Sequence, residues 1–312
     1  MHWQPSASLQ TLRNRSLLIQ KIRQFFMERK YLEVETPIVS HYGSTDINIF
    51  SLKATCFGKT CYLHTSPEFF MKRLLASGSG PIFQIAKVFR DSEQGRWHNP
   101  EFTLLEWYKL EVSHHELLKE VDQFLQHILG CEPLVKRSYQ EVFATYCNIN
   151  PHTAPLDDLK NVAKKHKLAD VLLDDDMDSY LYLLMSHVIE PILAKELTPT
   201  AVYDFPITQS SLARIINNRA ARFEVYFKGV ELANGFYELT DVEEQSQRFA
   251  TEKTTREKKG IDCPPLDPFF LRALKEGLPN CSGVALGVDR LIALALNETT
   301  ISNVLSFYFD RV

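Results

Sequence analysis

The sequence lacks the cysteine pairing and the cysteine spacing that mark many extracellular and zinc-binding proteins. Its six cysteines form no CxxC pair and no zinc-ligand spacing, which indicates free thiols in a reducing compartment. The first ten residues show no basic-then-apolar signal pattern. No apolar run approaches the ~18 residues of a membrane span, and the longest candidate, 284–296, is broken by Asp289 and Arg290. We therefore expect a soluble cytoplasmic protein with no membrane partner.

Common phosphate-binding and hydrolase motifs are absent as well. Residues 58–60 (GKT) resemble the end of a phosphate-binding loop, but that pattern needs a glycine where Lys53 stands. No GxGxxG, HExxH or GxSxG pattern occurs. The net charge of −4 and the pI near 6.2 argue against a large, undirected basic surface for nucleic acid.

The composition and the hydrophobic pattern predict a folded α+β protein. Hydrophobic residues make up 45% of the chain and charged residues 24%, so a sizeable core is expected. Apolar residues at helical spacing predict a helix over Leu9–Lys30, followed by extended chain to Ser40. Strand signals on both sides flank a helix-rich segment at about 113–200. We predict one domain over 1–312, a mostly antiparallel sheet flanked by helices, with 113–200 as a helical insertion.

The helix-rich segment opens on Ser113-His114-His115-Glu116, which has the pattern of a capping box and predicts a helix to about Leu129. Two adjacent histidines suggest a metal site. Because no third ligand is nearby, we interpret His114 and His115 as exposed residues of the first helical turn.

Chemically useful side chains gather on a predicted hairpin at 88–108. Side chains alternate along a strand, so Phe102, Glu106 and Tyr108 share one face, and Arg90 and His98 precede them. This pattern predicts a site that contains cations, a carboxylate and a phenol. An amphipathic hairpin whose polar face is merely solvated is the alternative.

A second hairpin is predicted at 222–231, where Lys228-Gly229 suits a two-residue turn. That register pairs Tyr226 with Glu231 and places Glu224 on the same face, on the diagonal. Two carboxylates so close repel unless a cation lies between them, and Mg²⁺ fits such ligands. The alternative is that both glutamates simply face water.

In a regular strand, the chemically useful residues that follow this hairpin would lie on the opposite face from Glu231. Asn234, Phe236 and Glu238 alternate with one another but are out of phase with Glu231. For all of them to line one pocket, we predict a bulge or bend near 233–235.

The segment 282–290 predicts a strand that passes through two glycines into an apolar helix. Glycine lets a ligand approach the backbone closely. Arg290 lies in the first turn among apolar neighbours, so it needs either a carboxylate or a bound phosphate as its partner.

Together these segments resemble the core of class II aminoacyl-tRNA synthetases, most closely that of lysyl-tRNA synthetases. The resemblance covers nearly the whole chain, through the helix and strand ending at Pro37 and the segments 89–102, 231–236 and 287–290. It implies an ATP-dependent enzyme that forms an aminoacyl-adenylate. It also implies a homodimer, with the segment ending at Pro37 at the interface.

The resemblance further implies roles for individual residues. Arg90 and Arg290 are the expected catalytic residues, bound to ATP phosphates, and Phe102 is expected to stack on adenine. The residues expected to bind ATP are Arg90, Glu93, His98, Asn99, Phe102, Glu224, Glu231 and Arg290. Those expected to bind the amino acid are Ser66, Glu68, Glu106, Tyr108, Asn234, Phe236, Glu238 and Ala285. Glu224 and Glu231 are expected to hold Mg²⁺.

The sequence departs from lysyl-tRNA synthetases at three places. Ser92 interrupts the usual Arg-x-Glu pattern, so Glu93 is the candidate for the adenine contact. Ala285 stands where those enzymes usually have glycine, and its methyl group is expected to favour a β-amino acid. Only about eight residues precede the first core helix, so we expect no anticodon-binding domain.

A truncated, acidic core of this kind resembles the bacterial ligases that attach β-lysine to a lysine side chain of elongation factor P. The segments 222–236 and 281–290 match that family particularly closely. The resemblance implies activation of (R)-β-lysine or lysine, with elongation factor P as the acceptor and tRNA not expected as a partner. Two alternatives stay open: an enzyme that charges a tRNA without reading its anticodon, and a non-catalytic, synthetase-like regulatory subunit.

Overall fold

The computed structural model describes residues 3–168, 171 and 175–312, which form two compact units. The first unit comprises Met1–Ser113, His127–Leu129 and Glu238–Val312, and the second comprises His114–Gln126 and Gly130–Tyr237. Residues 169, 170 and 172–174 of the predicted helical insertion lie outside the described part of the chain. No helix in the described part is long and apolar enough to cross a membrane.

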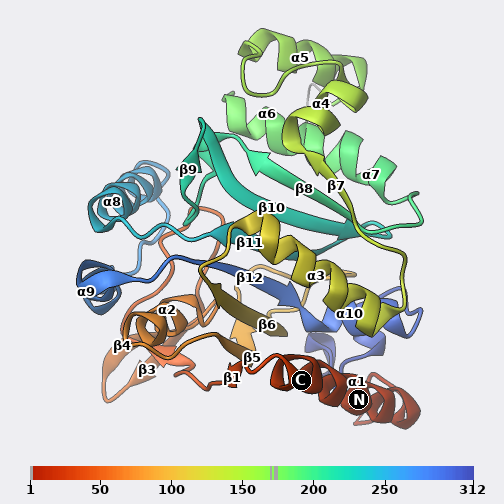
Figure 1. Cartoon of the computed structure of the whole chain (residues 1–312), viewed down its shortest axis with the longest axis vertical. Coiled ribbons are helices and arrows are strands. Elements are labelled where there is room, and N and C mark those ends of the chain that lie inside the picture. Colours follow the sequence, from red (N-terminus) through yellow and green to blue (C-terminus); the bar gives the residue numbers. More distant parts are fainter. Residues whose placement is uncertain (1–2, 169–170, 172–174) are drawn as a thin grey trace. The chain divides into compact units, whose positions relative to one another are not determined.

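The first unit contains two sheets and several helices (Figure 1). Its elements are α1 (Leu9–Glu28), β1 (Leu32–Glu33), β2 (Val39–Ser40), β3 (Lys53–Cys56), β4 (Lys59–Leu63), α2 (Glu68–Ala76), β5 (Ile82–Phe89), β6 (Glu101–Leu110), α8 (Val242–Lys258), α9 (Pro268–Gly277), β12 (Cys281–Gly287) and α10 (Val288–Ala295), with short 3₁₀ turns at Ile301–Asn303 and Phe309–Arg311.

The predicted N-terminal helix is confirmed as α1, drawn in red in Figure 1. Its N-cap is Ser8, whose hydroxyl accepts a hydrogen bond from the Thr11 amide at 3.0 Å. Phe26 is fully buried and stacks on Phe83 with ring centroids 4.7 Å apart. Leu17, on the same predicted stripe, is 63% exposed. The helix therefore buries only part of its apolar surface within this unit.

The larger sheet of the first unit places β5 between β1 and β6, and β6 next to β12. Only β1 and β5 pair in parallel, and the other two pairings are antiparallel. A smaller antiparallel sheet follows the order β2-β4-β3. Because paired residues of antiparallel strands point to the same side, β5, β6 and β12 present one continuous face.

The second unit combines a sheet with a helical layer (Figure 1). Its elements are α3 (His114–Leu129, whose last three residues belong to the first unit), β7 (Val135–Ser138), α4 (Tyr139–Cys147), α5 (Leu156–Lys165), α6 (Met177–Leu184), a π-helix (Met185–Ile189), α7 (Glu190–Leu193), β8 (Thr200–Phe205), a 3₁₀ turn (Ile207–Gln209), β9 (Ile215–Ile216), β10 (Arg219–Phe227) and β11 (Val230–Tyr237).

The sheet of the second unit is also mostly antiparallel. β10 pairs antiparallel with β8, β9 and β11, and only β7 and β8 pair in parallel. Its core includes the stacked rings of Tyr139 and Phe143, which are both buried together with Phe205. The predicted α+β fold with a mostly antiparallel sheet is thus confirmed, and α3 ends at the predicted Leu129.

Candidate active site

One face of the first-unit sheet is lined by alternate residues of β6 and β12. Tyr108 lies opposite Gly283, and Glu106 lies opposite Ala285. A Cβ atom at Gly283 would lie 2.3 Å from the Tyr108 ring and 2.5 Å from the Glu238 carboxylate. The glycine therefore lets Tyr108 and Glu238 approach the backbone of β12 closely.

Lys72 of α2 lies beneath this face and is only 1% exposed. Its Nζ lies 2.6 Å from both Glu68 Oε1 and Glu238 Oε2. Although burial alone lowers it, the two carboxylates hold the pKa of Lys72 above its ordinary value. Sequence reasoning missed this residue, although its spacing of four from Glu68 on a helix is a recognisable ion-pair signal.

The carboxylate of Glu106 is held by two hydroxyl donors. Ser66 Oγ and the Tyr108 hydroxyl donate to its two oxygens, each at 2.7 Å. Ser66 Oγ also accepts from the Glu68 amide at 3.1 Å and so joins the start of α2 to β6. Glu106 and Tyr108 are 2% exposed, which excludes a merely solvated polar face on this part of the hairpin.

Burial shifts the titration of these carboxylates. Burial first and the neighbouring Glu68 second raise the pKa of Glu106 to about 8. Burial, opposed by the Lys72 ammonium, raises the pKa of Glu238 to about 7. We call Ser66, Glu68, Lys72, Glu106, Tyr108 and Glu238 the acidic cluster. It contains three carboxylates and one lysine, so a cationic ligand would stabilise it.

Arg90 begins the loop between β5 and β6. Its Nη1 lies 3.5 Å from Glu93 Oε1, and its guanidinium lies over the Phe102 ring, 5.1 Å from the centroid. The predicted proximity of the arginine to the aromatic ring is therefore present. Glu93 and Phe102 both lie against Arg90, which places three predicted ATP-binding residues together.

Arg290, in the first turn of α10, contacts the same loop. Its Nη2 lies 2.7 Å from His98 Nε2, and its Nε donates to the Trp97 carbonyl at 3.1 Å. Burial first, followed by the charges of Arg290 and Arg90, lowers the pKa of His98. The His98 imidazole that faces Arg290 is therefore neutral, and its Nε2 can accept a hydrogen bond from the Arg290 guanidinium.

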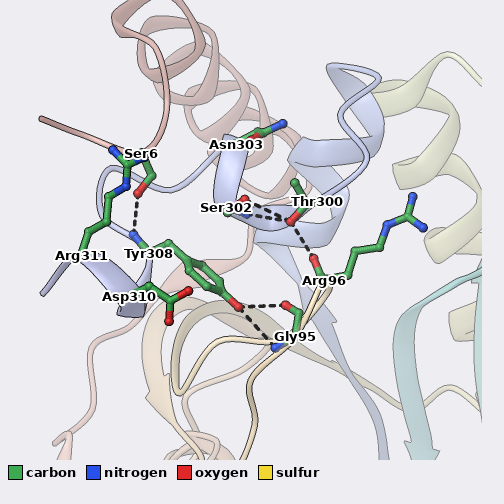
Figure 2. Close-up of a pocket in the computed structure, with 9 residues that line it drawn as sticks. All are labelled: Ser6, Gly95, Arg96, Thr300, Ser302, Asn303, Tyr308, Asp310 and Arg311. Carbon is green, nitrogen blue, oxygen red and sulfur yellow. Dashed lines mark hydrogen bonds between the residues drawn. The ribbon is translucent and has the colours of Figure 1, made fainter. Parts of the chain in front are cut away.

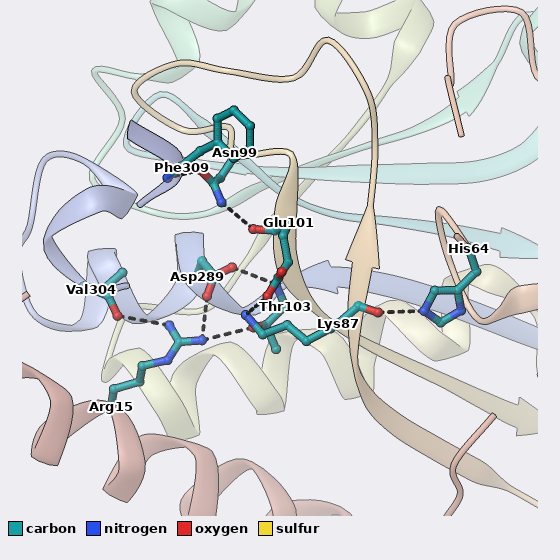
Figure 3. A network of polar contacts seen from close by, with 9 residues as sticks. All are labelled: Arg15, His64, Lys87, Asn99, Glu101, Thr103, Asp289, Val304 and Phe309. Carbon is teal, nitrogen blue, oxygen red and sulfur yellow. Dashed lines mark hydrogen bonds and ion pairs between the residues drawn. The ribbon is translucent and has the colours of Figure 1, made fainter. Parts of the chain in front are cut away.

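The residue next to Arg290 has a structural role (Figure 3). Asp289 forms a buried ion pair with Arg15 at 2.6 Å and accepts from the Thr103 amide at 2.7 Å. Arg15 also donates to the Thr103 hydroxyl at 3.1 Å. This network ties α1, β6 and α10 together and fixes the start of the helix that presents Arg290.

Asn99 also binds backbone groups (Figure 3). Its Nδ2 donates to the Glu101 carbonyl at 2.6 Å, and its Oδ1 accepts from the Phe309 amide at 3.1 Å. The side chain is 5% exposed. The structure thus places Asn99 as a brace between the loop and the C-terminal turn.

The C-terminal segment holds the loop through Tyr308 (Figure 2). The Tyr308 hydroxyl accepts from the Gly95 amide at 3.3 Å and donates to the carbonyls of Gly95 and His98 at 3.0 and 3.1 Å. A polar cavity of about 340 Å³ opens beside it. Its lining is Ser6, Gly95, Arg96, Thr300, Ser302, Asn303, Tyr308, Asp310 and Arg311.

The second unit contains the other predicted hairpin, β10–β11. Tyr226 pairs with Glu231 across the Lys228-Gly229 turn, as predicted, and both turn residues have positive φ. The bulge predicted near 233–235 is present directly before these residues: all three are in regular register, and the extra residue is Leu232. The register shift needs only one unpaired residue, which here directly follows Glu231.

The effect of the bulge on the side chains is the predicted one. Glu224 lies opposite Asn234, and Arg222 lies opposite Phe236. Paired residues share a face, so these four side chains and Glu231 lie on the same side of the hairpin. The Asn234 Oδ1 atom is buried and has no hydrogen-bond partner within the described ranges. That oxygen is a free acceptor for a ligand.

Glu224 is fixed by two neighbours on its own strand. Arg222 Nη2 and the Tyr226 hydroxyl each lie 2.5 Å from one of its carboxylate oxygens. Arg222 and Tyr226 were not found from the sequence, although both lie two residues from Glu224 on a strand. The carboxylates of Glu224 and Glu231 are both partly accessible on this face, and such oxygen ligands suit Mg²⁺.

The interpretation of the histidine pair is wrong for His114. Its side chain is buried, at 4% exposure, and its Nε2 lies 3.2 Å from Asp204 Oδ1. His115 is exposed, as expected. A third potential ligand is therefore present, but it lies on β8, some 90 residues further along the chain. Local sequence reasoning had no signal for it.

Comparison with known proteins agrees with this architecture. The family model of class II tRNA synthetases (D, K and N) matches residues 1–311. Three relatives bear the name elongation factor P–(R)-β-lysine ligase. The protein from Haemophilus ducreyi is 48% identical, over 100% of this chain and 97% of its own. Those from Histophilus somni and Photorhabdus laumondii are 50% and 47% identical, each over 99% of this chain and 98% of its own.

Proposed function

Because the chain belongs to the class II tRNA synthetase family (D, K and N), we propose that it activates (R)-β-lysine or lysine with ATP and transfers it to a lysine side chain of elongation factor P. The names of its relatives support this assignment over nearly their full length. The chain is then an ATP-dependent, AMP-forming ligase. Its acceptor is a translation factor, so we also propose that it acts in the cytoplasm.

The acidic cluster is the observation that supports the amino acid substrate. It holds the carboxylates of Glu68, Glu106 and Glu238 against the single ammonium of Lys72. Lysine and β-lysine each have two ammonium groups, one at the end of the side chain. Burial raises the pKa values of Glu106 and Glu238, and an additional substrate cation would favour the ionised forms of these carboxyl groups by pairing with them.

Asn234 and Phe236 of the second unit are also proposed to bind the amino acid. The unpartnered Asn234 Oδ1 can accept a hydrogen bond from an ammonium group. Phe236 lies on the same face and supplies an apolar surface for the methylene chain. Asn234 and Phe236 are therefore the proposed amino acid contacts in the second unit, and Ala285 is one of those in the first.

The proposed first step is in-line attack of the substrate carboxylate on the α-phosphorus of ATP. A new O–P bond forms, the bond to the β-phosphate oxygen breaks, and pyrophosphate leaves. Arg90 and Arg290 would bind the phosphates, and neutral His98 would keep the Arg290 guanidinium in place. Phe102 would support adenine. Positioning and charge stabilisation account for most of such a reaction.

Glu224 and Glu231 are the proposed Mg²⁺ ligands. The fit rests on two carboxylates on one face of the hairpin, one of them held by Arg222 and Tyr226. When bound, the ion would neutralise phosphate charge. Arg222 and Tyr226 would fix the orientation of the Glu224 carboxylate before the ion arrives.

The proposed second step transfers the aminoacyl group. The amine of the acceptor lysine attacks the carbonyl carbon of the mixed anhydride, the C–N bond forms, AMP leaves and one proton is released. The product is an amide on elongation factor P.

We also propose a homodimer. Several large apolar side chains of the N-terminal segment are exposed, and they are Leu9, Leu17, Met27, Leu32, Ile38 and Val39. A group of this kind along one helix and the following extended chain suits a protein interface. The same segment, ending near Pro37, lies at the dimer interface in the family that the sequence resembles.

The experiment that tests the proposed activation is ATP–pyrophosphate exchange with a set of amino acids. We expect exchange with (R)-β-lysine or lysine, and far less with norleucine, which lacks the terminal ammonium. A Glu238→Gln variant should lose this preference. Equal exchange with lysine and norleucine would contradict the role of the acidic cluster, and no exchange with any amino acid would favour a non-catalytic subunit.

A further inference from the structure

His114, His115 and Asp204 form a cluster that the proposed reaction does not use. All three lie in the second unit, the histidines in the first turn of α3 and the aspartate near the end of β8. Each contributes one potential ligand atom, and these atoms lie within 4.8 Å of one another. Two imidazoles and a carboxylate are common ligands of transition metals in proteins.

The distance between the His114 nitrogen and the Asp204 oxygen suits two ligands of one metal ion. His114 Nε2 and Asp204 Oδ1 are 3.2 Å apart. Two ligands on a tetrahedral ion, each at 2.0–2.1 Å, are separated by roughly 3.3 Å. His114 and Asp204 can thus bind one ion with little movement, and the ligand atom of His115 lies within 4.8 Å of both. The Asp204 carboxylate also supplies a negative charge that offsets the positive end of α3.

The backbone around Asp204 is unusual for a strand. Asp204 has a φ of 61°, in the left-handed region. Tyr203 pairs with Phe223 and Phe205 with Ala220, so Asp204 lies opposite two residues of β10 in a β-bulge. Bulges redirect side chains, and strained backbone of this kind concentrates at ligand sites. Here the bulge lies at the residue that reaches His114.

The buried ring of His114 has one nitrogen bonded to Asp204 and one that no group in the described part of the chain satisfies. Its Nδ1 is buried and has no hydrogen-bond partner in the described part of the chain. Buried polar atoms are normally paired. The ring of His115 is held edge-on against Tyr203, with centroids 4.9 Å apart, and 4.0 Å from the ring of His114. Both imidazoles are therefore positioned beside Asp204.

We propose that His114, His115 and Asp204 form a site for a divalent transition-metal ion, with Zn²⁺ as the ion that best fits two imidazoles and one carboxylate. Water would complete the coordination. The ion would link the start of α3 to β8 and stabilise the second unit. Its nitrogen ligands distinguish it from the proposed Mg²⁺ site, whose ligands are carboxylates.

The test is zinc binding by the full-length chain in the presence of excess Mg²⁺, measured by competition with a chromophoric chelator. His115→Ala is the informative variant because the side chain is exposed and its loss leaves the core intact. Asp204→Asn is a second one. His166→Ala, another exposed histidine at the end of α5, is the matched control.

We expect one zinc ion per wild-type chain and a raised unfolding midpoint with zinc. Affinity should fall more than about 100-fold in His115→Ala, beyond the effect of losing an outer-shell partner, and stay unchanged in His166→Ala. Cobalt should give the spectrum of nitrogen and oxygen ligands. Equal zinc affinity in wild type and His115→Ala, no zinc binding, or a cobalt–thiolate spectrum would overturn the proposal.

Discussion

Glu106 shows how a single buried carboxyl group links stability to ligand binding. Its pKa is raised from 4.5 to about 8 because it is buried and lies near Glu68. Between these values the folded chain keeps a proton that the unfolded chain has released. This proton therefore makes the free energy of unfolding fall as the pH rises through that range. A cationic substrate opposes this effect by favouring the ionised form.

The first prediction concerns Glu106→Gln. The amide keeps an acceptor for the Ser66 hydroxyl but does not titrate. We expect the variant to lose less stability than the wild type between about pH 5 and pH 8, measured as the urea midpoint without substrate. Parallel pH curves for the two proteins would show that the pKa of Glu106 is not raised.

Ala285 is the residue at which the sequence departs from lysyl-tRNA synthetases within the pocket face. It lies opposite Glu106 on β12 and packs, as Phe102 does, against the buried cluster of Ala86, Val88 and Leu104. Its methyl group thus occupies space on the face where the substrate amine is proposed to bind.

The second prediction is that Ala285→Gly shifts preference toward α-lysine. Removing one methyl group from a pocket changes discrimination by about tenfold or more. We expect the ratio of kcat/KM for (R)-β-lysine over α-lysine, measured by pyrophosphate exchange, to fall by that factor. Ala86→Gly, a change in the same cluster on β5, serves as the control. An unchanged ratio in Ala285→Gly would remove Ala285 as a specificity determinant.

Among the secondary-structure elements, β12 depends on a glycine for its position. Tyr108 occupies the space beside Gly283, where a methyl group would lie 2.3 Å from the ring. The third prediction is that Gly283→Ala loses about 1–3 kcal/mol of stability, as overpacked sites do. Gly95→Ala, where nothing lies within 4 Å, is the control. Urea denaturation measures both, and similar midpoints for the two variants would contradict the packing argument.

Local patterns in the sequence predict most of the elements. Helical spacing identifies α1, the residues before His114 predict the start of α3, and Lys228-Gly229 fixes the β10–β11 register. The bulge was predicted near 233–235 from the need to bring Asn234 onto one face, and it lies directly before these residues. The alternation of side chains along the strand requires one unpaired residue, but it does not identify which residue that is.

For the whole molecule, the contacts that sequence reasoning missed join distant segments. Lys72 reaches Glu238, and His114 reaches Asp204. Neither pair has a periodic or spacing signal, because each depends on how strands and helices pack. The sequence predicted residues that belong to family motifs, such as Arg90 and Phe102. It did not predict contacts between buried residues that lie far apart in the chain.

The fourth prediction concerns assembly. Leu17 is 63% exposed on α1, in the segment proposed as the dimer interface. A charge placed in an apolar interface is costly, so Leu17→Glu should convert a dimer to a monomer in light scattering after size-exclusion chromatography. Leu197→Glu, at an equally apolar residue that is 89% exposed elsewhere, should leave the dimer intact. A wild-type monomer would contradict the proposal.

The central claim is that this chain activates β-lysine and transfers it to a protein. Incubation with labelled (R)-β-lysine, ATP, elongation factor P and bulk tRNA tests it most directly, with Arg290→Ala as the inactive comparison. Removing that phosphate contact should raise the barrier by about 3–4 kcal/mol. The account predicts label on elongation factor P, dependent on ATP and greatly reduced in the variant. Label on tRNA with none on elongation factor P would contradict it.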